Sequence, residues 1–351
     1  MNIGIPKEIK TAEGRVALTP EACLELIVKG HSLFIEQRAG CLSGFDDEQY
    51  RRIGVTVCSD AKSLYEACEL IVKVKEPIDG DLNYLTSKHI IFCFLHLAAN
   101  VELADKLSTI GLTAVGFESV RENNQLPILK PMSKIAGKLS IQIGTTLLHQ
   151  YQGGSGLLLG GLADNSVDKG QVLVLGAGSA GKQAALLARK IGANVYVFDK
   201  SLQALTSLSQ IDSSINIINN QEECLSLIST TNLLIGALLI PGKKTPHFIN
   251  RSHIKLMMRG SVIIDISVDQ GGCVETTRPT TYDEPTFVEE GVTHFCVANM
   301  PGAVPRTATQ ALSAVLPPYI HRLTQGNWGE KDDVMKSAIN VKAGKVLIDL
   351  L

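Results

Sequence analysis

The chain has 351 residues, of which 45% are hydrophobic and 19% are charged, and its formal net charge is −2. This length favours two domains, and the apolar fraction is sufficient for the buried cores of a globular protein. A chain so close to neutral has no global positive field, which excludes nucleic acid and an acidic membrane surface as expected partners. The apolar runs stop short of the roughly 20 residues of a membrane span, so we expect no membrane segment.

The eight cysteines are scattered along the chain, and none form a CxxC pair. This spacing predicts free, buried thiols in a reducing compartment, with no disulfide framework and no metal site. The first residues, MNIGIPKEIK, contain no apolar run after their charges, so we expect no signal peptide. We therefore expect a cytoplasmic protein.

The first part of the chain alternates short β-branched runs with helical stretches. Residues 2–6 predict a strand, and residues 17–30 predict a helix. Thr19 is the expected N-cap, Pro20 the first helical residue and Gly30 the stop. Further strands are expected at residues 31–37, 70–75, 90–95 and 112–118.

A second series of the same kind follows a long helical stretch at residues 132–152. Such alternation is typical of α/β units around parallel sheets, here two Rossmann-like, doubly wound domains. We expect a nucleotide-binding domain at residues 131–303, and a discontinuous substrate domain made of residues 1–130 and 304–351. The expected elements are strands at 171–176, 194–199, 233–240, 262–268 and 293–299, and helices at 179–192 and 307–326.

The strongest motif is VLVLGAGSAGKQAALLARKIGANVYVFDK, in which Gly176, Gly178 and Gly181 form GxGxxG between a strand and a helix. The first glycine allows a tight turn, the second lets backbone approach a pyrophosphate, and the third lets helix and strand pack closely. Asp199 ends the next strand, where an acid accepts hydrogen bonds from ribose hydroxyls. The acid favours NAD because it would repel a 2′-phosphate, although Lys200 beside it could pair with one.

Two lysines lie in the apolar stretch IVKVKEP at residues 71–77, and Lys73 and Lys75 are expected on the same face of a strand. One explanation is that the strand is an exposed sheet edge, where lysines discourage aggregation. The other is that the strand ends in a site for an anionic substrate. The next strand candidate ends in FCFLHLAAN, with His96 where the strand should stop. Consecutive strands are often neighbours, so Lys75 and His96 could share one rim, where a cation and an imidazole suit a small keto acid.

Two further stretches carry charged candidates. In VIIDISVDQGG the strand delivers Asp265 and Asp269 towards its carboxyl end, where ligands of open α/β sheets bind. We interpret Asp265 as structural, whereas Asp269 fits structural and acid–base roles equally well. Arg15 in EGRVALTP can clamp a carboxylate with two parallel hydrogen bonds, but the residues around it favour a surface ion pair. Arg278 has no stronger local interpretation than a loop arginine.

With these residues in view, the chain resembles the alanine dehydrogenase branch of the alanine dehydrogenase and pyridine nucleotide transhydrogenase family. The resemblance extends over nearly the whole chain. The segments that carry it are IGIPKEIK, RVALTP, LSGFDDEQY, LIVKVKEP, FLHLAA, KPMSKIAG, GGSGLLLGG, GAGSAG, IGALLIPG, IDISVDQGGCVETTRPTTYDEPTF and CVANMPGAVPRT.

The resemblance implies two Rossmann-like domains with the active site in the cleft between them, and a homohexamer. It implies reversible oxidative deamination of L-alanine by NAD, giving pyruvate, ammonium and NADH. Arg15 and Lys75 match the family's substrate-binding residues, and His96 and Asp269 match its acid–base pair. The positions that match its coenzyme-lining stretches are Ser133, Gly176, Gly178, Ser179, Ala180, Gly181, Asp199, Leu238, Leu239, Ile266, Ser267, Val268, Arg278, Val297, Ala298, Asn299 and Met300.

The chain departs from the family pattern at three positions outside the proposed acid–base pair, which are Lys134, Ser155 and Ala204.

Two other functions remain open from the sequence. One is the nucleotide-binding domain of a proton-translocating transhydrogenase, which predicts a membrane partner. The other is a catalytically inactive NAD-binding regulator, which would keep GAGSAG but could lose the substrate residues. All four substrate and acid–base residues are present, which counts against the regulator.

Overall fold

The computed structural model describes residues 1–162, 166–238 and 247–349. The chain divides into two compact units, one made of Met1–Met132 with Pro301–Leu351 and the other of Ser133–Met300. The sequence had placed these boundaries after residues 130 and 303. The observed boundaries fall inside helix α6 (Leu129–Leu147) and the 3-10 helix η7 (Met300–Ala303).

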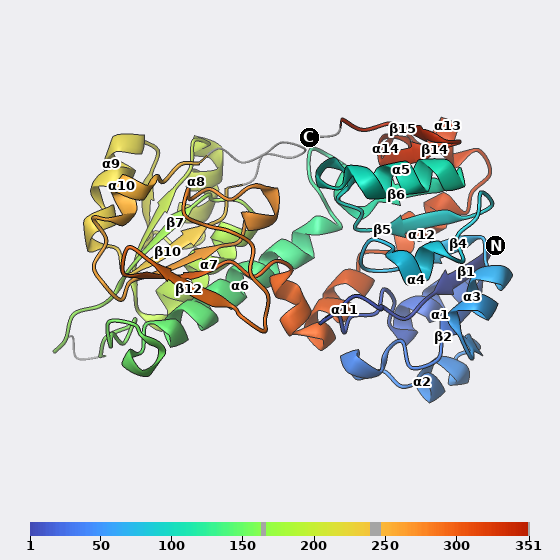
Figure 1. The fold of residues 1–351 in the computed structure, drawn as a ribbon, viewed down its shortest axis with the longest axis horizontal. Coiled ribbons are helices and arrows are strands. Elements are labelled where there is room, and N and C mark those ends of the chain that lie inside the picture. Colours follow the sequence, from blue (N-terminus) through green and yellow to red (C-terminus); the bar gives the residue numbers. More distant parts are fainter. Residues whose placement is uncertain (163–165, 239–246, 350–351) are drawn as a thin grey trace. The chain divides into compact units, whose positions relative to one another are not determined.

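The first unit contains an eight-stranded sheet in the order β15-β14-β6-β5-β4-β1-β2-β3 (Figure 1). Strands β1 to β6 are all parallel, and their order reverses at β1 and β4, as in a doubly wound fold. The C-terminal strands β14 and β15 add an antiparallel edge. The strands are β1 (Asn2–Ile5), β2 (Ser32–Glu36), β3 (Thr56–Cys58), β4 (Leu70–Val72), β5 (Ile90–Cys93), β6 (Thr113–Gly116), β14 (Ile339–Lys342) and β15 (Lys345–Val346).

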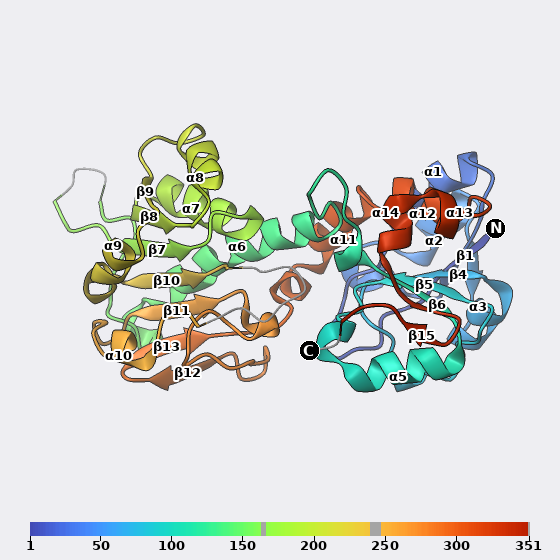
Figure 2. The same ribbon diagram turned by 90° about the horizontal axis from the view of Figure 1, so that it is seen from above.

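Helices cover both faces of this sheet, with α3 and α5 on one face and α1, α2 and α12 on the other (Figure 2). Helix α1 begins as predicted, because the Thr19 hydroxyl accepts a hydrogen bond from the Ala22 amide and Pro20 occupies the first turn. The helices of this unit are α1 (Pro20–Val28), α2 (Asp47–Arg52), α3 (Ala61–Ala67), α4 (Asp79–Leu82), α5 (Val101–Ile110), α11 (Pro305–Ser313), α12 (Pro317–Leu323), α13 (Trp328–Lys331) and α14 (Asp333–Ser337), with 3-10 helices η1 (Cys41–Ser43), η2 (Leu97–Ala99) and η3 (Phe117–Ser119).

The second unit contains a seven-stranded sheet in the order β12-β13-β11-β10-β7-β8-β9. All pairs are parallel except the β12–β13 hairpin, and the order reverses at β7 and β10. This is the arrangement of a dinucleotide-binding Rossmann sheet with one antiparallel edge strand. The strands are β7 (Gln171–Leu175), β8 (Asn194–Phe198), β9 (Asn216–Ile218), β10 (Leu233–Gly236), β11 (Val262–Asp265), β12 (Thr286–Glu289) and β13 (Val292–Phe295).

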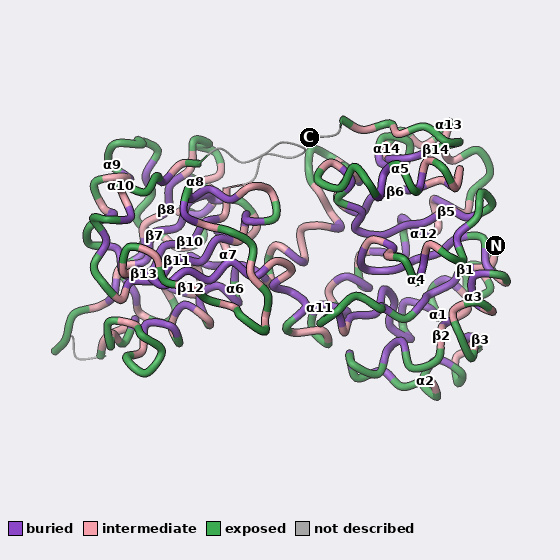
Figure 3. Tube along the Cα trace, in the orientation of Figure 1, coloured by how far each residue is buried: buried purple, intermediate pink, exposed green. Residues whose placement is uncertain are grey.

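Most of this sheet is buried (Figure 3). Successive side chains of a strand point to opposite faces, so the contacts of those side chains show which helices cover each face. Leu173 and Leu175 pack into a cluster with residues of α9 and α10. On the other face, a Cβ on Gly144 of α6 would meet Leu233, and one on Gly181 of α7 would meet Val174. The remaining elements are α7 (Ser179–Ile191), α8 (Leu202–Ser209), α9 (Gln221–Ser226) and α10 (Arg251–Ile254), with 3-10 helices η4 (Gln150–Gln152), η5 (Ile228–Thr230) and η6 (Val268–Gln270).

The predicted class, two doubly wound Rossmann-like domains, is confirmed, but some predicted elements differ. The strand expected at 70–75 ends at Val72, and it lies in the middle of its sheet rather than at an exposed edge. The helix expected at 307–326 breaks into α11 and α12, because Pro317 starts a new helix and cannot continue the old one. Residues 239 and 240 of another expected strand lie outside the described residues. Across the described ranges, no helix is long and apolar enough to cross a membrane.

Candidate active site

The three glycines of the GxGxxG loop each meet a different steric situation at the end of β7. Gly176 has a φ of 105°, and a Cβ there would lie 2.5 Å from the Ala237 carbonyl oxygen. A Cβ on Gly181 would lie 1.8 Å from the Gly176 carbonyl oxygen, so this residue lets α7 pack closely on the loop. A Cβ on Gly178 would meet nothing within 4 Å. The loop therefore has open space beside Gly178, at the β7–β10 switch point where Rossmann sheets bind their ligands.

Asp199 directly follows β8, and its carboxylate is held against the glycine loop. Its Oδ2 accepts a hydrogen bond from the Ala177 amide at 2.7 Å, and its Oδ1 accepts one from the Ser201 amide at 2.8 Å. The side chain is half-buried, whereas Lys200 is exposed. A carboxylate has about four acceptor positions. Asp199 can therefore hold the loop and accept hydrogen bonds from a diol.

Helix α6 packs against the start of α7, next to the GxGxxG turn. A Cβ on Gly137 would lie 2.0 Å from the Ala180 carbonyl oxygen, so only glycine permits this approach. Ser133 is half-buried and lies one helical turn before Gly137, on the same side of α6. The next residue, Lys134, is exposed. In the second unit, Ser133 on α6 thus lies near the N-terminus of α7, which begins with Ser179 and Ala180.

The two aspartates after β11 have different environments. Asp265 is fully buried and accepts hydrogen bonds from the Ser267 and Cys273 amides, each at 2.9 Å, and from the Thr277 hydroxyl. Burial raises the pKa of Asp265, although these hydrogen bonds lower it in part. This agrees with its structural interpretation. Asp269 lies in η6 and is exposed, so its carboxylate is accessible for proton transfer.

The loop that carries Asp269 contains buried polar atoms without partners. Among the described residues, the Ser267 hydroxyl and the Gln270 side-chain carbonyl are buried and make no hydrogen bond to the protein. Val268 is buried and Ile266 half-buried. A buried hydroxyl normally has a partner. The Ser267 hydroxyl therefore suits contact with a ligand of the kind that the glycine loop accommodates.

Arg278 is exposed but is not a simple loop arginine. Its guanidinium lies over the Phe287 ring of β12, 4.3 Å from the ring centroid. Phe287 in turn stacks on His294 of β13, at 4.9 Å between centroids. His294 is buried, and burial lowers its pKa despite a hydrogen bond from Nδ1 to the Val292 carbonyl. The hairpin β12–β13 therefore sets the position of Arg278.

The segment after β13 is held by hydrogen bonds to the loop before β12. The Ala298 amide donates to the Thr280 carbonyl at 3.3 Å, and the Tyr282 hydroxyl donates to the Met300 carbonyl at 3.0 Å. Val297 and Met300 are buried, Ala298 is half-buried, and Asn299 has a positive φ of 65°. Leu238, at the end of β10, is half-buried, and Leu239 lies outside the described residues.

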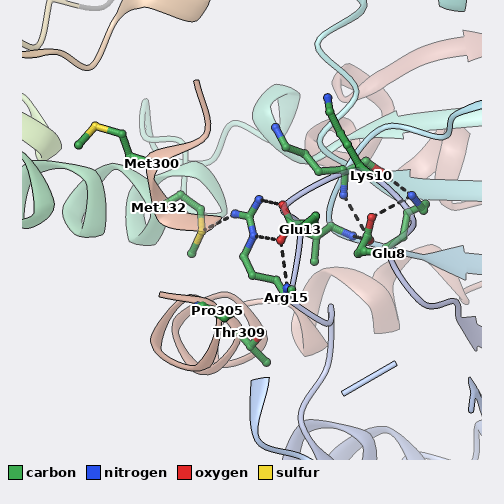
Figure 4. A network of polar contacts seen from close by, with 12 residues as sticks. Glu8, Lys10, Glu13, Arg15, Met132, Met300, Pro305 and Thr309 are labelled. Atoms are coloured by element: carbon green, nitrogen blue, oxygen red, sulfur yellow. Dashed lines mark hydrogen bonds and ion pairs between the residues drawn. The ribbon is translucent and has the colours of Figure 1, made fainter. Parts of the chain in front are cut away.

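In the first unit, Arg15 is buried in a paired arrangement with Glu13 (Figure 4). Its Nε donates to Glu13 Oε1 at 2.7 Å and its Nη2 donates to Oε2, while Nη1 lies 3.4 Å from the Met132 sulfur. Both side chains are almost fully excluded from solvent. Arg15 is therefore not in a surface ion pair. One edge of its fork is fixed by Glu13, and the sequence interpretation did not include this residue.

The C-terminal segment anchors the loop that carries Arg15. The Val16 amide donates to the Thr309 hydroxyl at 3.0 Å, and the Thr19 amide donates to the Ser313 hydroxyl at 2.8 Å. Both acceptors lie on α11. These contacts explain why residues from both ends of the chain form one unit.

Lys75 and His96 follow neighbouring parallel strands, β4 and β5. Backbone pairing continues past the strand ends, because the Phe94 amide donates to the Val74 carbonyl at 3.0 Å. The two residues therefore lie at the same carboxyl edge of the sheet, as the order of the strands had suggested. Lys75 is 8% exposed, and His96 is exposed.

A carboxylate from the next strand holds the backbone at His96. Glu118, just after β6, accepts hydrogen bonds from the His96 amide at 2.6 Å and the Leu95 amide at 3.2 Å. The backbone of His96 is left-handed, with a φ of 50°, which is uncommon for a residue other than glycine. Its ring stacks on Phe94 at 5.8 Å with an interplanar angle of 5°. Glu118 and Phe94 thus fix both the backbone and the ring of His96.

The structure therefore brings Lys75 and His96 to the carboxyl edge of the first sheet, because they follow the neighbouring strands β4 and β5. Arg15 belongs to the same unit and lies further along the chain after β1, where Glu13 holds its side chain and α11 holds the backbone beside it. The structure also adds Glu13 and Glu118, which the motifs did not reveal. A glutamate two residues before Arg15, and one at the end of the strand expected at 112–118, were the available signals. No group of metal-ligating side chains occurs among the residues that the structure describes.

Comparison with known proteins gives a consistent result for both units. The family model "Alanine dehydrogenase/PNT, N-terminal domain" matches residues 4–136, and its C-terminal counterpart matches residues 140–349. An alanine dehydrogenase of Bacillus subtilis is 43% identical over 91% of this chain and 84% of its own length. A solved L-alanine dehydrogenase structure has a TM-score of 0.93 and 42% identity, covering 99% of this chain and 97% of that one.

A transhydrogenase structure from Sinorhizobium meliloti covers 99% of both chains with a TM-score of 0.83, but its identity is 23%, so it shows a shared fold alone. The two family models together span almost the whole chain, and the relative at 43% identity covers most of it. The glycine loop and the carboxyl-edge residues described above lie within the matched ranges. The chain therefore belongs to the alanine dehydrogenase/PNT family.

Proposed function

We propose that this chain catalyses the reversible, NAD-dependent oxidative deamination of L-alanine to pyruvate and ammonium. The observation that carries the proposal is the placing of Lys75 and His96 at one sheet edge, in a unit that also holds the buried Arg15 and in a chain 42% identical to a solved L-alanine dehydrogenase. A pyridine nucleotide is the cofactor expected of this family. The substrate domain is the first unit and the coenzyme domain is the second.

The residues of the second unit suit a dinucleotide. The open position at Gly178 and the N-terminus of α7 offer space and backbone N–H groups to a pyrophosphate. Asp199 accepts hydrogen bonds from the ribose hydroxyls. The nicotinamide, when bound, accepts a hydride from the substrate or returns one. We assign the remaining coenzyme contacts to Ser133, Ser179, Ala180, Leu238, Leu239, Ile266, Ser267, Val268, Arg278, Val297, Ala298, Asn299 and Met300.

Arg15 and Lys75 bind the substrate in this proposal. Arg15 binds the substrate carboxylate through its guanidinium, which Glu13 holds in a fixed orientation. Lys75 binds the carboxylate and the carbonyl oxygen of pyruvate. A fixed pair of this kind orients the substrate Cα, and orientation can account for several kcal/mol of the barrier, about 7–11 at best.

His96 and Asp269 exchange protons with the substrate and water. Loss of hydride from Cα converts the amine to an iminium, and water then adds to the carbon as a base removes its proton. The carbinolamine collapses when its nitrogen is protonated: the C–N bond breaks, ammonia leaves, and the hydroxyl gives its proton to a base as the carbonyl of pyruvate forms. The exposure of both side chains supports their access to water, and the fixed backbone of His96 supports a defined ring position.

An assay of the deamination reaction tests this function. Purified protein is mixed with NAD and L-alanine, and the rise in NADH absorbance is compared with the pyruvate and ammonium formed. The proposal predicts equal amounts of the three products. NADH formed without ammonium would contradict it.

Asp199 is expected to set the preference for NADH over NADPH. Asp199→Asn removes the negative charge that repels a 2′-phosphate and weakens the bonds to the ribose. A charge-assisted hydrogen bond contributes about 1.5–3 kcal/mol. We therefore expect the NADH-to-NADPH ratio of kcat/KM to fall about 10-fold or more. The exposed Glu222→Gln is the charge-matched control on α9. An unchanged ratio in Asp199→Asn would contradict this role.

We also propose a homohexamer in the cytoplasm. Similarity to the family supports the assembly, and the eight cysteines, all free, support a reducing compartment. Light scattering coupled to size-exclusion chromatography measures the assembly directly, and a particle mass other than six chain masses would contradict the hexamer.

A further inference from the structure

Lys73 is the most deeply buried lysine of the first unit, with 1% of its surface exposed. Its ammonium contacts Glu8 Oε2 at 3.0 Å and Asp81 Oδ2 at 3.2 Å. Burial lowers the pKa of Lys73, but the two carboxylates outweigh burial and hold that pKa above its ordinary value. Lys73 is therefore a cation within a buried ion cluster, and not the edge lysine that its sequence allowed.

The same ammonium also binds backbone on the chain that follows. Lys73 Nζ donates to the Lys75 carbonyl at 3.2 Å and lies 3.5 Å from the Glu76 carbonyl. Its partner Glu8 accepts a hydrogen bond from the Val74 amide at 2.6 Å and one from the Lys75 amide at 3.4 Å. Both the amide and the carbonyl of Lys75 are thus bound by the Lys73–Glu8 pair.

The cluster is itself fixed to two helices. The Tyr65 hydroxyl of α3 donates to Asp81 Oδ1 at 2.9 Å, and Asp81 Oδ2 accepts a bond from the Ile78 amide at 3.2 Å. Buried ion clusters add little net stability compared with well-packed apolar side chains. This cluster instead provides a rigid frame for the turn at residues 74–76, which leaves β4 at the carboxyl edge of the sheet.

We propose that Lys73 is a positioning residue, which with Glu8 fixes the backbone of Lys75 so that the Lys75 side chain meets the substrate in one orientation. The inference rests on the substrate-binding role proposed for Lys75. It assigns different tasks to the two lysines of IVKVKEP: Lys75 contacts the substrate, and Lys73 holds Lys75 in place.

Lys73→Met is expected to raise KM for pyruvate about 10- to 100-fold, the effect of a small misplacement at a binding residue. The dissociation constant for NADH, measured by fluorescence titration, should stay unchanged, because the coenzyme residues lie in the second unit. Tyr65→Phe is the matched control: it removes a hydrogen bond from the same cluster without touching the turn at residues 74–76. It should lower Tm and leave KM for pyruvate within about twofold of the wild-type value. Equal KM changes in the two variants would overturn the inference.

A double-mutant cycle with Lys75→Met separates this inference from the proposed function. If Lys73 acts through Lys75, Lys73→Met should have no further effect on KM in the Lys75→Met background. Additive effects would overturn the inference alone, whereas an unchanged KM in Lys75→Met would overturn the role of Lys75 itself. If Lys73→Met does not fold, Glu8→Gln takes its place in the cycle, because it keeps the Lys73–Asp81 pair and alters the bonds to the Val74 and Lys75 amides.

Discussion

His96→Asn is expected to lower kcat by about 10²- to 10⁴-fold, the usual contribution of a general acid–base residue. Asparagine is chosen because it tolerates the left-handed backbone that His96 adopts. Glu118 should still bind the Leu95 and His96 amides, so the loop should keep its conformation. The measurement is kcat for pyruvate amination, together with Tm and NADH affinity, both of which should be unchanged.

His149→Asn is the matched control for this variant. His149 follows α6 in the second unit, and its half-buried ring lies 5.7 Å from that of Tyr151. Its replacement should leave kcat unchanged. Near-normal turnover in a folded His96→Asn enzyme would contradict the acid–base role of His96.

Asp269→Asn is expected to reduce kcat by about 10²- to 10⁴-fold for the same reason. The change keeps the shape of the side chain and removes its ability to take up a proton. Asp269 is exposed in η6, and the buried hydrogen bonds of that region belong to Asp265, so folding should be unaffected. Kinetics in both directions and a thermal melt of the variant provide the measurement.

The corresponding control is Asp283→Asn, an exposed aspartate in the loop before β12. It should have wild-type kinetics. If Asp269→Asn retained turnover similar to that of this control, Asp269 would have a structural role and His96 would need another proton partner.

Much of the fold could be predicted because local signals and global topology agree. Thr19 and Pro20 mark the start of α1, and GxGxxG between β7 and α7, followed by a second strand and Asp199, indicates a Rossmann unit. The strand expected at 70–75 is longer than β4, which ends at Val72, although the Phe94 amide still donates to the Val74 carbonyl beyond that point. The sequence also did not reveal that the Lys73 ammonium binds the Lys75 carbonyl, because hydrophobic periodicity does not describe such a contact.

The candidate site was predictable only in its most chemically distinctive members. His96 and Lys75 lie together because consecutive strands are neighbours. Glu13 and Glu118 were missed because their importance lies in what they bind, the Arg15 fork and two backbone amides, and no sequence motif marks those contacts. Residues that position a site are visible from contacts, whereas residues that perform chemistry are visible from their side-chain type.

The most direct test of the function is the loss of NADH absorbance with pyruvate and ammonium, each omitted in turn. The proposal predicts that NADH is consumed only when both are present, with L-alanine formed in equal amount. Consumption with pyruvate alone would contradict reductive amination, and so would a protein that binds NADH but consumes none with both substrates present.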